Sequence, residues 1–449
     1  MEYIKLTPVD KWIINPVNAF ISKSSTGGIV LMISAAVAIA MANSPLSEWY
    51  HHFWENKISI GLTDGFSLDM SLHHWINDGL MAVFFFVIGL ELKREIVAGE
   101  LSNPKNAILP IAAGVGGMVF PALIYTAFNN GLDSMNGWGI PMATDLAFAL
   151  GILYLLGDRV PSSLKIFLTA FAIVDDLGSV LVIALFYTSE ISFVYLGIGI
   201  GLLILLFIAN YIGARNTWFY ALVGIGGVWL FFLLSGVHAT IAAILMAFTI
   251  PASAKINEPA FVKRMNEYLE KFKNADADNE VPTLTSDQLH ILDDIETCTR
   301  RALPPLQKLE HEMHPLVAFI VMPIFALANA GVTFSDDIMS SITSPVAMGA
   351  GFGLLFGKMI GIFGVSALLT RFKLVPPLEG ITTRHLFGLG LVSAIGFTMS
   401  LFINELAFRP LGEVGLEYIA QAKTGIIIVS LIGGVSGFLV LNRSTNLRA

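Results

Sequence analysis

The sequence contains few charged residues and almost no cysteine. Of its 449 residues, 13% are charged and 55% are hydrophobic, whereas soluble domains carry about 25% charged residues. This composition excludes a soluble globular enzyme. The single cysteine, Cys298, excludes an internal disulfide framework. Lys and Arg number 26 against 34 Asp and Glu, which gives a net charge of -8, so we expect no nucleic-acid partner.

Apolar segments recur along almost the whole chain. Residues 1–20 lack the basic, apolar and small-residue order of a cleavable signal peptide, so the first segment is expected to remain as a membrane helix. A bilayer core about 30 Å thick needs roughly 20 residues of helix, and twelve such helices are predicted. They cover residues 18–41, 75–95, 107–129, 139–157, 162–187, 193–213, 217–234, 236–252, 315–334, 345–370, 385–407 and 416–441.

The fold class that follows is an all-α polytopic membrane protein. Residues 253–314 form the one long polar interruption. We therefore expect eight helices in residues 1–252, a cytoplasmic insert or linker at 253–314, and four helices in residues 315–449, all within one integral transport domain.

The distribution of positive charge predicts the orientation, because cytoplasmic loops keep an excess of Lys and Arg. With the N-terminus inside, all but four of the 26 Lys and Arg residues fall on one side or at its helix ends. The exceptions are Lys57 and Arg409 on the other side and Lys358 and Lys423 within apolar segments. Both chain ends and the insert are expected in the cytoplasm.

A few charged residues lie far from any predicted helix end. Asp145 follows Thr144 in the fourth predicted helix, Asp175 and Asp176 are adjacent in the fifth, and Lys358 lies in the tenth. A charge in hydrocarbon costs at least ~2.5–3.5 kcal/mol on insertion scales. A buried ion pair that only joins helices is one explanation. Three carboxylates against one lysine leave surplus negative charge, however, and stability alone does not favour that surplus.

An exchangeable cation explains the surplus better. Carboxylate, hydroxyl and carbonyl oxygens suit small hard cations, and no His or Cys lies at this depth to suggest a transition metal. The fourth and eleventh predicted helices are also interrupted, by GWGIPMATD and LFGLGLVSAIGFTMS. Close helix packing through small residues is the alternative. Their matching places in two inverted repeats, helices 3–5 and 10–12, favour discontinuous helices at a transport site near the midplane.

Short motifs in a fixed order resemble the NhaA-type sodium/proton antiporters of bacteria over about 340 residues. They are WINDGLMAVFFFVIGLELKRE at 75–95, MATDLAFALG at 142–151, LKIFLTAFAIVDDLGSVLVIALFYT at 164–188, SGVHAT at 235–240, LEHEMHP at 309–315, FALANAGV at 325–332, GKMIGI at 357–362 and SAIGFTMSLFI at 393–403. The sequence departs from familiar members in the greater length of 253–314.

The resemblance implies a role for individual residues. Asp176 resembles the principal Na+ ligand and Asp175 its partner. Thr144 and Asp145 resemble the residues of the unwound part of helix 4, and Lys358 the lysine that pairs with the aspartates. The cytoplasmic cluster associated with pH sensing is matched by Glu91, Glu95, Glu310, His311 and His314. A salt-bridged helix end without a sensing role is the alternative for this cluster.

The function implied is secondary transport, not enzymatic catalysis. The resemblance implies export of Na+, and of Li+, in exchange for H+ by alternating access, with no cofactor. It further implies electrogenic, pH-regulated exchange, serving pH and sodium homeostasis, in the lipid of the bacterial inner membrane. The outer loop at 42–74 is a candidate interface for a homodimer. Rival readings are an intramembrane aspartyl protease, whose YD and GxGD motifs are missing, and a passive cation channel. Whether Lys358 carries a proton or only holds the site together stays open.

Overall fold

The computed structural model describes residues 26–62, 66–188, 191–275, 283–333, 338–376, 378 and 380–444. Residues 18–25 of the first predicted helix and the two chain ends assigned to the cytoplasm lie outside these ranges. Nearly all the described apolar segments are helical, as predicted.

The N-terminal half of the described chain contains eleven α-helices, of which α4, α10 and α11 are short. Its helices are α2 (Thr26–Ala42), α3 (Ser47–Glu55), α4 (Leu72–His74), α5 (Met81–Ala98), α6 (Pro104–Asn129), α7 (Leu146–Leu155), α8 (Ser162–Phe186), α9 (Phe193–Ile212), α10 (Thr217–Val223), α11 (Leu230–Leu234) and α12 (Ala239–Thr249).

The C-terminal half begins with the polar insert and ends with the longest helix. Its helices are α13 (Glu258–Asn274), α14 (Ser286–Ala302), α15 (Pro305–Leu316), α16 (Met322–Asn329), α17 (Ile338–Thr343), α18 (Pro345–Phe352), α19 (Val365–Arg371), α20 (Thr383–Val392), α21 (Phe397–Phe408) and α22 (Gly412–Ser444).

Eight helical stretches of the described chain are long and apolar enough to cross a membrane. A ninth is obtained if α2 and α3, which are bent by 113°, count as one. The difference from twelve has physical reasons. Helix α12 has only 11 residues, and α5 contains the charged sequence ELKRE in its C-terminal part. Helices α21 and α22 count together as one stretch, Phe397–Ser444. The chain is thus a polytopic helical membrane protein, and the number twelve stays a prediction.

Two of the predicted helices are interrupted, as their glycine, proline and hydroxyl residues suggested. A 3-10 segment, Asp133–Met142, precedes α7, and residues 143–145 between them are not helical. Likewise α20 ends at Val392 and α21 begins at Phe397. A helix break leaves unpaired N–H and C=O groups inside the bundle, and these groups need partners.

Lys358 lies between two π-helical segments, Gly353–Gly357 and Met359–Gly364. Single-turn π segments are frequent at functional sites because they change the direction of a side chain within an otherwise regular helix. On the side that faces α6 the helix has glycine, and a Cβ added at Gly361 would overlap the carbonyl oxygen of Gly116. This close approach brings the backbone that carries Lys358 against α6.

The structure departs from the sequence-based expectations at two places. Strands β1 (Lys57–Leu62) and β2 (Phe66–Ser71) form an antiparallel hairpin within the loop at 42–74, with Lys57 opposite Ser71. This hairpin was not predicted and accompanies an otherwise helical architecture. The alternation KISIGL has the period of two that indicates a strand. The ninth predicted helix begins at Pro305 rather than 315, because proline at a first helical position is favourable.

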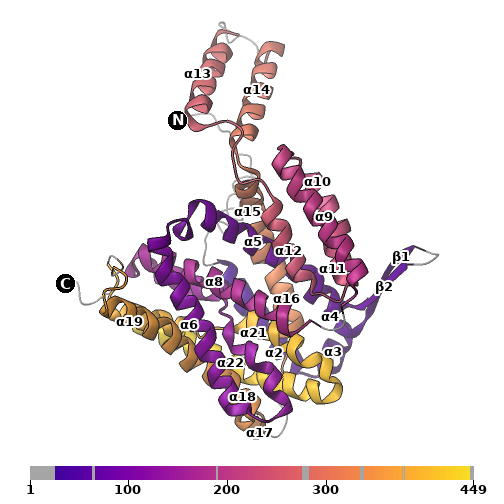
Figure 1. Cartoon of the computed structure of the whole chain (residues 1–449), viewed down its shortest axis with the longest axis vertical. Helices are drawn as coiled ribbons and strands as arrows, with labels where there is room; N and C mark the ends of the chain where they lie inside the picture. Colours follow the sequence, from indigo (N-terminus) through magenta and orange to yellow (C-terminus); the bar gives the residue numbers. More distant parts are fainter. Residues whose placement is uncertain are drawn as a thin grey trace.

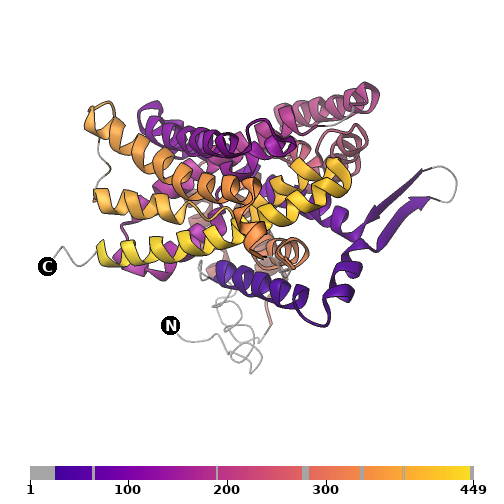
Figure 2. The ribbon, with the colours of Figure 1, turned by 90° about the horizontal axis from the view of Figure 1, so that it is seen from below.

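Figures 1 and 2 show how these parts are arranged. Helices α13 and α14 of the insert pack against each other and extend away from the bundle (Figure 1). The β1–β2 hairpin projects from another part of the bundle (Figure 2). Helix α22 packs along α18 and α20, and α6 packs against α8 and α18.

Candidate functional site

Helix α8 carries Asp175 and Asp176 in the interior of the protein, where their side chains are 1% and 2% exposed. The Lys358 ammonium, which is fully buried, lies 2.5 Å from Oδ2 of Asp175. Lys358 also donates to the carbonyl oxygen of Met142, the last residue of the 3-10 segment. Asp175 and Lys358 therefore form a neutral pair, and the lysine offsets the partial negative charge at the end of a helical segment.

Asp176 is placed differently from its neighbour. No ion pair of Asp176 is found among the described residues, and its Oδ1 atom is buried without a hydrogen-bond partner there. Oδ1 of Asp175 is also buried and unpartnered. An ionised carboxylate only accepts hydrogen bonds, and a buried one without partners is costly. Two such oxygens on adjacent residues fit a small hard cation as a transported substrate.

The two helix breaks touch each other at Thr144 and Asp145. The Asp145 N–H donates to the carbonyl oxygen of Ile395 at 2.7 Å. Its carboxylate accepts from the Phe148 N–H at 3.1 Å and from both the N–H and the hydroxyl of Thr398, at 3.1 and 2.5 Å. Asp145 thus caps α7 and the first turn of α21 together, where the N-terminal partial charges of two helices favour an anion.

All five residues predicted for the ion site are buried close to one another. Thr144 donates to the carbonyl oxygen of Ser393 at 3.3 Å, and Asp145 is near enough to Asp176 for electrostatic interaction. Their arrangement divides them into two groups. Asp175, Asp176 and Lys358 hold the charge at the centre, and Asp145 joins the broken helices. Thr144 contacts both groups, because it donates to Ser393 and also lies close to Asp175.

The predicted acidic cluster is brought together on α5 and α15 around an arginine that was not among the predicted site residues. Arg94 pairs with Glu95 at 3.0 Å and with Glu310 at 2.7 Å. Glu91, one turn before Glu95, is close enough to both Glu310 and Asp176 to interact electrostatically. Glu91 is therefore the member of the cluster that lies within electrostatic range of Asp176.

The two histidines of this cluster have a different position. His311 and His314 lie on exposed parts of α15. His311 is within electrostatic range of Glu310 and of His314, but no hydrogen bond or ion pair of either histidine is found among the described residues. They stand beside the ion-paired cluster rather than within it.

Comparison with known proteins identifies the family of this chain. Residues 18–441 match the protein family described as Na+/H+ antiporter 1. The chain belongs to this family of Na+/H+ antiporters. It is 46% identical to the Na(+)/H(+) antiporter NhaA of Oleidesulfovibrio alaskensis over 97% of this chain and 95% of the relative. It is 44% identical to the Na(+)/H(+) antiporter NhaA 1 of Saccharophagus degradans over 97% of this chain and 94% of the relative.

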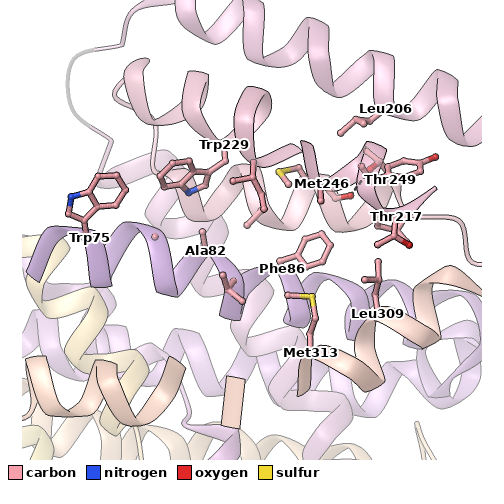
Figure 3. Close-up of a pocket in the computed structure, with 17 residues that line it drawn as sticks. Trp75, Ala82, Phe86, Leu206, Thr217, Trp229, Met246, Thr249, Leu309 and Met313 are labelled. Atoms are coloured by element: carbon pink, nitrogen blue, oxygen red, sulfur yellow. Dashed lines mark hydrogen bonds between the residues drawn. The ribbon is translucent and has the colours of Figure 1, made fainter. Parts of the chain in front are cut away.

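A member of this antiporter family is a secondary transporter of the membrane, not an enzyme. A large cavity of the described chain lies away from the charged site. This cavity of about 360 Å³ lies between α5, α10, α12 and α15 and is bordered by Trp75, Phe86, Trp229 and Met246 (Figure 3). No charged side chain of the described residues lines it, so it offers no polar path for a cation.

The antiporter also contains an ion-pair network that the sequence argument missed. Glu405 on α21 is buried and lies 2.9 Å from Lys423 on α22 and 3.1 Å from Arg409. Arg409 also contacts His73 at 2.8 Å, and His73 contacts Asn329 at 3.1 Å. Burial lowers the pKa of His73 to about 4, although the neighbouring Glu405 carboxylate acts to raise it, and Lys423 and Arg409 add to the lowering. The i, i+4 spacing of Glu405 and Arg409 was the available signal.

Proposed function

We propose that this antiporter exports Na+, and also Li+, in exchange for H+ by alternating access at Asp175 and Asp176. The observation that carries the proposal is the difference between two adjacent buried carboxylates. Asp175 has the Lys358 ammonium at 2.5 Å, whereas Asp176 has no ion pair among the described residues and an unpartnered oxygen. Asp176 is therefore the carboxylate whose charge a transported cation balances.

Competition at Asp176 is sufficient for obligatory exchange. When Asp176 is ionised, a Na+ ion balances its charge, and when it is protonated the cation is released. Because charge in a low-dielectric site is strongly disfavoured, the unloaded, ionised site is the least favourable of the three states. This ordering favours the conformational change when Asp176 carries Na+ or H+. It disfavours the change when the site is empty, and this keeps the two fluxes coupled.

Electrogenic exchange requires a second titrating group beside Asp176. The Asp175–Lys358 pair is the candidate, because a proton moved to or from this pair changes the charge carried with each Na+. The pair and Asp176 interact at close range, so they titrate as one coupled system. A net charge moved inward then contributes about 2.3 kcal/mol per 100 mV to Na+ export.

The joined helix breaks are the moving element in this proposal. The contact of Asp145 with Thr398 couples the two broken helices, so that a movement of one requires a movement of the other. We infer that they are the middle helices of two inverted repeats, helices 3–5 and 10–12 of twelve, which rock around the aspartates.

Regulation and placement in the membrane complete the proposal. The Arg94 cluster with Glu95 and Glu310, close to Glu91, is a candidate for the pH response because its carboxylates share one cation. The excess of Lys and Arg on one predicted side supports a bacterial inner-membrane protein with cytoplasmic termini. The projecting β1–β2 hairpin (Figure 2) supports a homodimer interface at 42–74.

Proteoliposomes with an internal pH dye and labelled sodium test the exchange. The parent protein should couple Na+ flux in one direction to H+ flux in the other, over a range of pH. Asp176→Asn, which keeps the side-chain volume, should abolish both fluxes while the protein still inserts and elutes as a single species. A passive channel would instead carry Na+ without a counterflow of protons. Normal exchange by Asp176→Asn would refute the site.

A further inference from the structure

Ser179 lies one helical turn beyond the aspartates on α8. At about 100° per residue, its position around the helix axis falls between those of Asp175 and Asp176. Side chains of an α-helix lean towards its N-terminus, so the short Ser179 side chain is directed back over the turn that carries the two carboxylates. Ser179 is 1% exposed and thus belongs to the same buried region.

The Ser179 hydroxyl has no hydrogen-bond partner among the described residues. A buried serine in a helix usually donates to the carbonyl oxygen four residues earlier. Two threonines of the same part of the chain do so: Thr169 donates to Lys165 at 3.1 Å and Thr188 to Ala184 at 2.8 Å. A buried hydroxyl without a partner costs free energy, which makes alanine the expected residue if Ser179 had only a packing role.

Three unpartnered oxygens are therefore gathered within one turn of α8. They are Oδ1 of Asp175, Oδ1 of Asp176 and Oγ of Ser179. Hard cations prefer such a mixture of carboxylate and neutral oxygen ligands. We propose that Ser179 Oγ is a ligand of the transported Na+, which it contacts together with the two aspartates. This inference rests on the function proposed above and adds a neutral ligand to its site.

A neutral ligand has a specific consequence for exchange. The hydroxyl contributes to cation binding without adding a titrating group, so it shifts the competition at Asp176 towards Na+ and leaves proton binding largely unchanged. Loss of the hydroxyl weakens the binding of Na+ relative to the binding of H+. The half-saturating Na+ concentration then rises at every pH, while the maximal rate at saturating Na+ is kept.

Ser179→Ala in proteoliposomes tests this inference. We expect the half-saturating Na+ concentration to rise about three- to ten-fold, the size of one lost neutral contact. The maximal rate should be retained. Ser179→Thr, which keeps a hydroxyl, should stay closer to the parent. Ser366→Ala removes another fully buried, unpartnered hydroxyl, on α19, and should leave the half-saturating concentration unchanged.

Thermal unfolding of the purified protein separates a ligand from a packing role. Without Na+, Ser179→Ala should unfold at or above the parent's temperature, and the stabilisation produced by added Na+ should be smaller than in the parent. Parent-like Na+ dependence in Ser179→Ala would overturn the inference, as would a loss of stability with unchanged Na+ dependence. Retained exchange in Asp176→Asn would refute the proposed function itself, whatever the result for Ser179.

Discussion

Asp145 and Thr398 join the two broken helices, and a double-mutant cycle on this pair measures their interaction free energy. The Asp145 carboxylate accepts three hydrogen bonds, from the Phe148 N–H and from the N–H and hydroxyl of Thr398. It is fully enclosed, at 1% exposure. Asp145→Ala removes all three bonds, whereas Thr398→Val removes only the hydroxyl and keeps the shape of the side chain.

The expected loss follows from these three bonds. A hydrogen bond to a charged acceptor contributes about 1.5–3 kcal/mol, so three set an upper bound of about 9 kcal/mol. Water admitted to the space left by the carboxylate satisfies part of the freed donors, and we expect about 3–5 kcal/mol for Asp145→Ala. Thr398→Val should cost about 1–2 kcal/mol. The double variant should be less destabilised than the sum by at least about 1 kcal/mol.

Thermal unfolding in one detergent at fixed pH, followed by tryptophan fluorescence, provides the four stabilities. Asn257→Ala is a matched control, because Asn257 caps the exposed helix α13 through the Ala260 N–H and should cost only about 1 kcal/mol. Folded Asp145→Ala should also need more Na+ for half-saturation without losing its maximal rate. If the Asp145 and Thr398 substitutions change the free energy of unfolding additively, the two side chains do not join the helices as described. A complete loss of exchange at saturating Na+ in Asp145→Ala would make Asp145 an essential ion-site residue.

Four further predictions concern other parts of the molecule. Lys358→Gln leaves a buried carboxylate without its counterion and should lower the free energy of unfolding by about 3 kcal/mol or more. If exchange by this variant still responds to membrane potential as the parent's does under a potassium/valinomycin clamp, the lysine is structural. A reduced response would identify it as a proton carrier. Gly361→Ala places a Cβ against α6 and should lower the melting temperature, whereas Gly201→Ala, which meets open space, should not; equal effects would contradict this packing. Glu405→Gln weakens two ion pairs and should lower the melting temperature while half-saturation by Na+ is kept; a changed Na+ dependence would place Glu405 in the transport path. The pKa of His73 falls from 6.5 to about 4 on folding, so between these pH values the unfolded chain binds a proton that the folded protein does not. The free energy of unfolding should therefore decrease as the pH is lowered from 6.5 to 4, by up to about 1.4 kcal/mol per pH unit. His73→Asn should flatten the plot of melting temperature against pH in this range, and an unchanged plot would refute the assignment.

The sequence predicts well those features that depend on local composition. Apolar runs indicate the membrane helices, and glycine and proline near Pro141 and Gly396 indicate the breaks. The cost of charge in hydrocarbon selects Asp175, Asp176 and Lys358 without any structural information. Each of these predictions depends on residues within one helix, so it needs no knowledge of how the helices pack.

Features that depend on contacts between helices were not predictable in the same way. From the sequence, Asp145 is interpreted as part of the surplus negative charge. Its partner Thr398 lies 253 residues away, so the contact becomes visible only when the two helix breaks are seen to lie side by side. Glu405 lies near a predicted helix end and was overlooked, because its partner Lys423 belongs to the next helix. The β1–β2 hairpin was missed because the loop was read for its composition rather than for its period of two.

The central claim is that Na+ and H+ compete for one buried carboxylate, Asp176. Proton release on Na+ binding tests it most directly, with purified protein in weakly buffered detergent and a pH indicator dye. The account predicts that added Na+ releases protons from the parent at a pH where the site is partly protonated, and that Asp176→Asn releases none while remaining folded. Binding of Na+ to the parent without proton release, or unchanged release from Asp176→Asn, would contradict it.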